Sequence, residues 1–276
     1  MATYITVAEV RRTCGISDSD ISDADMGYII DEIEDQTPRF LNTAIVPTQK
    51  IEFRDGDGTN RIVLYKNPVL SVRELKIDGT SITIDGNLNI ERPSGFIELD
   101  SVSGSPEYAL FKQKSRSVIV KYLYGLVDET STSTTTTADS TAGTSVDLAV
   151  ADETDFAEND WVDIYGMDGK QEVAQITATA SNQITVDQLV HTHESGSTVV
   201  KMEVNETIKR LMRIAASISA VARIIGQSST DTTGYTLGEL SVQKGEPYTQ
   251  WRETATQLIR ERDEILERIK IRFSIQ

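Results

Sequence analysis

The chain has 276 residues, 38% of them hydrophobic, so it is long enough to bury a substantial core in one large domain or two smaller ones. Its 27 basic and 43 acidic residues give a net charge of −16, the wrong sign for a protein that grips nucleic-acid phosphates. A single cysteine excludes an intrachain disulfide. Together with only two histidines, it leaves few ligands for a transition metal. No apolar run has the length of a membrane span, so we expect no membrane partner.

The acidic residues are concentrated in one segment. Residues 1–127 carry 14 basic and 19 acidic side chains, residues 128–200 carry 1 and 14, and residues 201–276 carry 12 and 10. A strongly acidic segment between two nearly balanced flanks indicates a separate module in the middle of the chain.

Two helices are predicted at the N-terminus. Thr6 and Glu9 have the spacing of a capping box, and Gly15 ends the first helix. Apolar residues at helical spacing between Met26 and Leu41 predict the second helix, which Pro38 should kink or end.

The middle of the chain reads as strands. Between residues 46 and 126, short runs with a period of two are separated by turns such as DGDGTN and SGSP, which predicts a small antiparallel sheet. Segment 128–145 is rich in Thr and Ser and is predicted to be a linker, because it has little apolar surface to bury. A second group of short strands predicts an inserted acidic β-module over 146–203.

Helical periodicity returns after Asn205, which can cap a helix that Gly226 ends, and Pro247 opens a last helix. Small side chains on the first of these helices permit close approach to another helix, either within the subunit or between neighbouring copies. The residues predicted for this packing are Ala215, Ala216, Ser219 and Ala220.

The last eight residues show a strand pattern where the helix should be ending. Ile269, Ile271, Phe273 and Ile275 alternate with polar residues. A strand needs a neighbour, which is either a sheet of this chain or the exposed edge of another protein.

These elements predict an α+β fold, with a helical core from the N- and C-terminal helices, a small antiparallel β region and an inserted all-β domain. The predicted core comprises 1–127 and 204–276, and the inserted module comprises 146–203.

Candidate chemistry is sparse. His191 and His193 have a spacing seen in some metal sites, with Glu194 beside them, but a polar turn is the favoured interpretation. Trp161 and Tyr165 could form an aromatic platform for carbohydrate, although Trp161 suits the core of the module better. No catalytic motif is present, so we predict no enzymatic activity, no bound metal and no cofactor.

The order of parts resembles that of the head-to-tail adaptor, or head-completion, proteins of long-tailed bacteriophages and related archaeal viruses. Three stretches carry the resemblance: ITVAEVRRTCGISDSDISDADMGYIIDEIEDQTPRFLN at the N-terminus, NPVLSVRELKIDG, and LGELSVQKGEPY before the last helix. The resemblance covers roughly 1–127 and 204–276. Segment 128–203 departs from it and looks like a β-module that recurs in phage structural proteins.

The resemblance implies a ring, commonly of twelve copies, that binds the portal protein beneath the capsid vertex and provides a platform for the next neck or tail protein. DNA would pass through the lumen without sequence-specific binding. The implied location is the neck of the virion, with assembly in the host cytoplasm. The C-terminal tail would dock on the portal through Ile269, Ile271, Arg272, Phe273 and Ile275. The alternative is an accessory structural protein that binds carbohydrate or a host surface through the inserted module.

Overall fold

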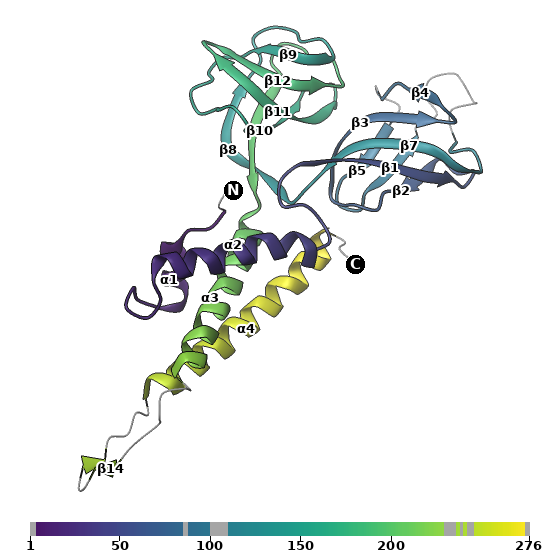
Figure 1. Cartoon of the computed structure of the whole chain (residues 1–276). Coiled ribbons are helices and arrows are strands. Elements are labelled where there is room, and N and C mark those ends of the chain that lie inside the picture. Colours follow the sequence, from purple (N-terminus) through teal and green to yellow (C-terminus); the bar gives the residue numbers. More distant parts are fainter. Residues whose placement is uncertain are drawn as a thin grey trace. The chain divides into compact units, whose positions relative to one another are not determined.

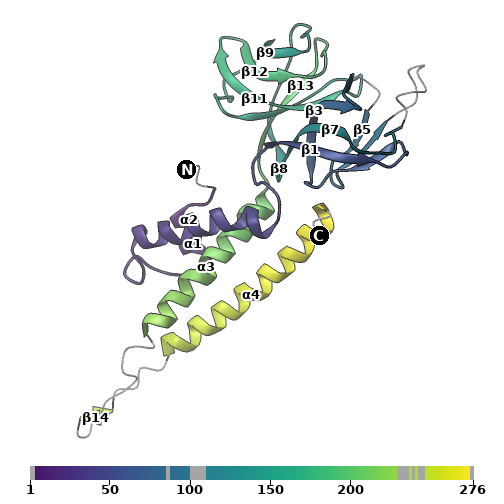
Figure 2. The ribbon, with the colours of Figure 1, turned by 45° about the vertical axis from the view of Figure 1, so that its right-hand side comes forward.

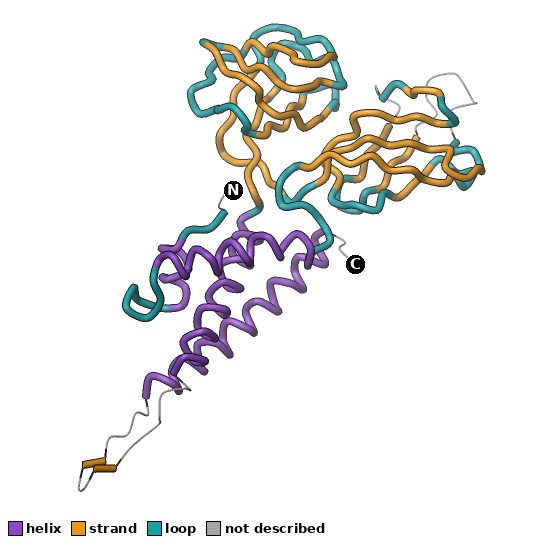
Figure 3. The backbone as a smooth tube through the Cα atoms, in the orientation of Figure 1, coloured by secondary structure: helices purple, strands orange, loops and turns teal. Residues whose placement is uncertain are grey.

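The computed structural model describes residues 4–84, 88–99, 110–228, 236–237, 240–241 and 246–273, and it describes side chains within 4–84, 88–99, 110–225 and 251–269. The chain forms two compact units (Figures 1 and 3). The helical unit comprises Met1–Leu41 and Glu206–Gln276, and the β unit comprises Asn42–Asn205.

The helical unit is built around one central helix. Its members are α1 (Val7–Cys14), α2 (Asp23–Phe40), α3 (Glu206–Ser228) and α4 (Glu246–Phe273). Helix α3 packs against each of the other three, and Figure 2 shows α4 running along it. Both ends of the sequence therefore contribute to a single helical core.

The helix boundaries follow local chemistry. The Thr6 side chain accepts a hydrogen bond from the backbone N–H of Glu9, and the Glu9 carboxylate accepts one from the backbone N–H of Thr6. The predicted capping box is therefore confirmed. Gly15 ends α1 in the left-handed region at φ 69°. Helix α2 continues through Pro38, which removes only the hydrogen bond to the carbonyl four residues earlier, and ends two residues later at Phe40.

The first β-lobe, residues 42–126, is a sandwich of two sheets. One sheet has the order β1-β7-β3-β4 and the other β2-β6-β5, and their facing apolar side chains form one core. The strands are β1 (Thr48–Gly56), β2 (Arg61–Val63), β3 (Val69–Ile77), β4 (Thr80–Ile82), β5 (Leu88–Glu91), β6 (Phe96–Leu99) and β7 (Lys114–Tyr124).

The second β-lobe, residues 127–205, is one antiparallel sheet of order β8-β13-β10-β11-β12-β9. Its two outer strands meet through hydrogen bonds from Thr137 N to Ala149 O (2.8 Å) and from Ala151 N to Thr135 O (2.9 Å), so the sheet curls back on itself around its own core. The strands are β8 (Val127–Thr135), β9 (Gly143–Ala149), β10 (Trp161–Tyr165), β11 (Gln171–Ala180), β12 (Gln183–Leu189) and β13 (Thr198–Val204).

The predicted fold class is wrong. Strands β1 to β13 make the β unit the larger of the two, so the chain is mainly β rather than a helical core with a small β region. The predicted division also differs from the structure, because residues 42–126 form one compact unit with the second β-lobe and not with the helices.

Segment 128–145 is not a linker. It supplies most of β8 and the start of β9, with Thr134 and Thr136 buried. Threonine is β-branched and favours strands, and its hydroxyl can be satisfied by backbone groups, so a polar composition did not prevent folding. The strand predicted for 269–275 is also wrong over the described residues, because α4 continues as helix to Phe273.

The two β-lobes share an apolar cluster of Leu70, Leu123, Val127, Val173 and Met202, with Trp161 packed against it. Among the described residues, no helix combines the length and apolar character needed to cross a bilayer.

Candidate assembly surface

An apolar groove lies on the helical unit between α2, α3 and α4. It has a volume of about 350 Å³. Its apolar lining comes from Ile33 and Phe40 of α2, Leu211 and Ala215 of α3, and Leu266 of α4. Phe40 is 69% exposed although it continues the apolar side of α2, so the groove presents an aromatic ring to solvent.

The polar groups at this groove are already satisfied locally. The Thr37 hydroxyl donates to the carbonyl of Ile33 at 2.7 Å, one turn back along α2. The Arg262 guanidinium donates to Asp263 Oδ1 from Nε at 3.0 Å and from Nη2 at 2.8 Å. The groove can therefore bury an apolar side chain without stripping these groups of their partners.

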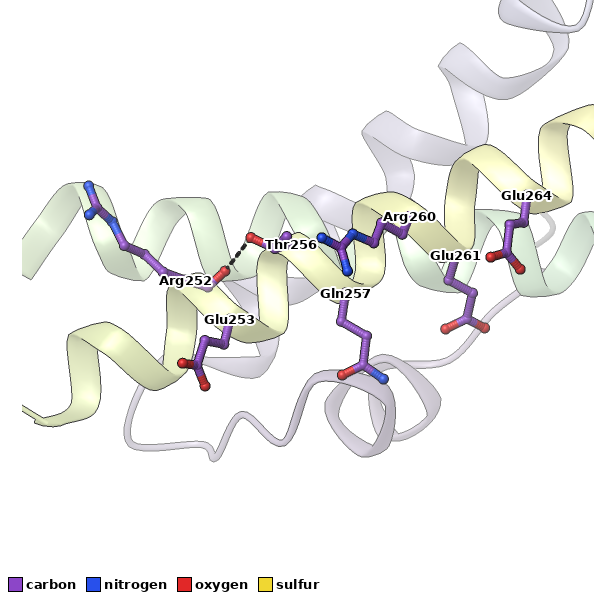
Figure 4. A pocket seen from close by; sticks show the side chains of 7 residues that line it. All are labelled: Arg252, Glu253, Thr256, Gln257, Arg260, Glu261 and Glu264. Atoms are coloured by element: carbon purple, nitrogen blue, oxygen red, sulfur yellow. Dashed lines mark hydrogen bonds between the residues drawn. The ribbon is translucent and has the colours of Figure 1, made fainter.

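A second surface is the polar face of α4, drawn in Figure 4. Glu253, Gln257 and Glu261 extend from the same side of the helix, as their four-residue spacing requires. Glu261 accepts a hydrogen bond from Arg210 Nε of α3 at 3.0 Å, which ties this face to α3. The face is a shallow, solvated surface with charges of both signs.

The structure separates the four small residues predicted to pack either within the subunit or between copies. Ala216 and Ala220 are fully buried within the helical unit, and the Ser217 hydroxyl beside them donates to the Val10 carbonyl of α1 at 3.4 Å. These residues let α1 approach α3 closely. Ala215 lines the groove instead, and Ser219 is half-buried.

The predicted portal-docking residues fall at the end of α4. Ile269 is buried within the helical unit. The backbone of Ile271, Arg272 and Phe273 is helical, and Ile275 lies outside the described residues. The Ile269 side chain is therefore covered within the chain and not exposed as a docking residue would be.

The two histidines have a structural role in the second β-lobe. His193 is fully buried, and its Nε2 lies 2.9 Å from Glu172 Oε1. Glu172 also accepts the backbone N–H groups of Val190 (2.6 Å) and His191 (2.9 Å), so it holds the turn that follows β12. The backbone carbonyl of Glu194 accepts bonds from the Thr136 and Ser197 hydroxyls. Among the described residues, no three potential ligands converge as a metal site would need.

Trp161 is half-buried in the β unit, where it packs against the cluster that the two β-lobes share. The sequence placed Trp161 in the core of the inserted module, whereas in the structure it packs against this shared cluster and not in the module's own core. Tyr165 is half-buried, and burial together with the nearby carboxylates of Glu129 and Asp163 raises the pKa of its hydroxyl. Both side chains are therefore only partly exposed.

The groove was not predicted from the sequence. Phe40 lies in the apolar stretch that predicts the second helix, and its exposure follows from where α3 and α4 leave that stretch uncovered. The local signal was an aromatic residue two positions after the proline of this helix.

Comparison with known proteins gives little further guidance. No protein-family model matches the chain, and no curated protein matches it. Among solved structures, the chain shows a likeness to the Gp54 tailspike of Acinetobacter baumannii bacteriophage AP22 in complex with A. baumannii capsular saccharide, at 16% identity and a TM-score of 0.23. The likeness covers 28% of this chain and 15% of the tailspike chain, and at that score it carries no argument about function.

Proposed function

We propose that this protein is a non-catalytic structural component of a tailed-virus particle, a ring-forming adaptor in the neck between capsid and tail. The observation that supports the proposal is the apolar groove on the helical unit, with Phe40 exposed at its edge. In a monomer the apolar groove stays exposed to water, whereas in an assembly a neighbouring subunit can cover it.

The occupant of the groove is a neighbouring copy of the chain. A ring closes through a heterologous contact, in which the groove of one subunit meets a different surface of the next. The three stretches that resemble head-to-tail adaptor proteins supply α1, α2, β3 and the beginning of α4, so the helical unit is the part of the chain that the resemblance best covers. The portal protein would contact the C-terminal end of α4.

The charge of the chain suits a conduit. A net charge of −16 repels DNA phosphates, and each phosphate contact that is avoided removes a salt-dependent grip on the passing duplex. The next neck or tail protein would bind the opposite side of the ring.

Phe40→Asp tests the proposal directly, with Tyr28→Asp as its matched control. Both side chains are exposed aromatics of α2, at 69% and 72%, but only Phe40 lines the groove. Native mass spectrometry of the full chain, alone and with the portal protein of the same virus, should show rings for the wild type and for Tyr28→Asp. Phe40→Asp should remain monomeric while keeping its helical circular dichroism.

A wild-type chain that stays monomeric with and without the portal protein would contradict ring assembly. Rings formed by Phe40→Asp would show that the groove is not the contact between copies.

The second candidate function is carbohydrate or host-surface binding. Trp161 packs half-buried against the cluster that the two β-lobes share, which weakens binding through Trp161. Binding through the first β-lobe is supported instead by Phe96, which is exposed there beside polar side chains.

A further inference from the structure

Six side chains form a regular grid on the outer face of the β2-β6-β5 sheet. Arg61 pairs with Glu98, and Glu98 pairs with Asn89, in one row across the three strands. Val63 pairs with Phe96, and Phe96 pairs with Glu91, in the next row. Since alternate residues of a strand point to the same side, all six share one face.

The opposite face of the same sheet fixes this arrangement. Ile62 and Ile97, which lie between the two rows, are buried in the core of the first β-lobe. A slip of one residue would expose them, so the register and the grid are strongly determined. The Gly95 N–H donates to the Glu91 carbonyl at 3.0 Å, which closes the turn between β5 and β6 and holds Glu91 opposite Phe96.

The first row offers hydrogen-bonding groups in prepared positions. Glu98 Oε1 accepts from Arg61 Nε at 3.0 Å and from Asn60 Nδ2 at 3.1 Å, so the carboxylate is held in one orientation. The other oxygen of the Glu98 carboxylate can accept a hydrogen bond from a ligand hydroxyl. The hydrogen bond from Arg61 also lowers the pKa of Glu98, which keeps the carboxylate an ionised acceptor.

The second row offers an apolar surface. The Phe96 side chain is 37% exposed, and Val63 is similarly exposed beside it. A hollow of about 350 Å³ lies over the face and is lined by Phe96 together with Arg61, Asn89, Glu91 and Glu98. Neighbouring rows on one face are about 7 Å apart, and neighbouring strands are about 4.8 Å apart. A ligand ring stacked on the Phe96 side chain would therefore hold the groups at its edge near the first row, which is polar.

We propose that this face, defined by Arg61, Asn89, Glu91, Phe96 and Glu98, binds a neutral saccharide. A sugar ring has an apolar C–H face, which suits Phe96, and a rim of hydroxyls, which suits the carboxylates, the amide and the guanidinium. Two carboxylates and one arginine give the face a negative balance, so it disfavours phosphates and other anions.

The proposal goes beyond the adaptor function and does not depend on ring assembly. It also differs from a platform at Trp161 and Tyr165, because its residues all belong to the first β-lobe.

Isothermal titration of the full chain with neutral gluco-, manno- and N-acetylglucosamine oligosaccharides tests the proposal. At least one of these probes should bind the wild type, and Phe96→Ala and Glu98→Gln should each weaken that binding about tenfold. The matched control is Phe53→Ala. Phe53 is an exposed aromatic of β1, on the other sheet, and Arg116 lies 4.9 Å over its ring.

Each remaining outcome overturns the proposal. One is the absence of binding by every probe in the panel, and another is binding that Phe96→Ala leaves unchanged. A third is binding that Phe53→Ala weakens as much as Phe96→Ala does. Capture of an extended peptide through Phe96 without any saccharide binding would assign the face to a protein partner instead. Equal unfolding temperatures of the variants and the wild type establish that each variant is folded.

Discussion

Arg92 and Asp163 form a two-point ion pair between the two β-lobes, with Nη1 2.8 Å from Oδ2 and Nη2 3.3 Å from Oδ1. Asp163 is fully buried on β10, and Gln171 of β11 donates to its Oδ2 at 2.7 Å. Arg73 of β3 makes a second pair of this kind with Asp187 of β12, at 2.6 and 3.1 Å. The two pairs and the shared apolar cluster fasten the lobes into one unit.

Removing Arg92 should destabilise the β unit strongly. Arg92→Ala leaves the Asp163 carboxylate buried without its charged partner, although Gln171 still donates to it, and breaking a buried pair on one side costs about 3 kcal/mol of unfolding free energy. Urea denaturation followed by tryptophan fluorescence measures the loss. The control is Arg39→Ala, which removes an exposed pair with Asp35 on α2 and should cost under about 0.5 kcal/mol. Equal losses in the two variants would contradict the clamp.

Glu129, which lies near this ion pair, should make the free energy of unfolding depend on pH. Burial, followed by the charge of Asp163, raises the pKa of Glu129, while Arg92 opposes the shift. The folded chain then binds a proton more tightly than the unfolded chain, so this group favours folding at low pH. Its contribution is lost as the pH rises from the ordinary glutamate value through the raised one. Glu129→Gln should abolish this part of the pH profile of unfolding, and an unchanged profile would refute the assignment.

The helices were predictable because their signals are local. A capping box at Thr6, a left-handed glycine at position 15 and helical spacing in α2 and α3 each fix an element within a few residues. The strand around Thr134 was not predicted, because its signal is not local. This strand exists because β13 pairs with it from sixty or more residues away, and composition within a short window does not reveal such a partner.

The surface residues were less predictable than the elements. Phe40, Phe96 and Val63 are apolar residues that a period-based analysis places in a core. Whether each is covered depends on long-range packing, which leaves one beside a groove and the other two on an open sheet face. Conversely, Glu52 is a charged residue in the middle of a strand, and its residue type predicts exposure to solvent. It is nevertheless buried.

Glu52 should be essential to the first β-lobe. Its carboxylate accepts the Tyr122 hydroxyl at 2.7 Å and the Tyr65 N–H at 3.0 Å, inside the sandwich. Glu52→Leu would leave both donors unsatisfied and should cost about 3 kcal/mol of unfolding free energy. Glu52→Gln keeps an acceptor oxygen and should cost clearly less. Chemical denaturation of both variants makes the comparison, and an equal loss would mean that the volume of the side chain matters rather than its hydrogen bonds.

Thr136 tests whether threonine hydroxyls hold the second β-lobe together. Its Oγ1 donates to the Glu194 carbonyl at 3.0 Å and accepts the Ser197 N–H at 3.0 Å, and the side chain is buried. Thr136→Val keeps the shape and the β-branch but breaks both bonds, so it should lower the unfolding free energy by about 2 kcal/mol. Thr137→Val, at the exposed neighbour, changes the same groups without burial and should be nearly neutral. Thermal unfolding of the two variants decides the matter: if both melt like the wild type, the strand is held by its backbone ladder alone and the buried hydroxyl contributes nothing.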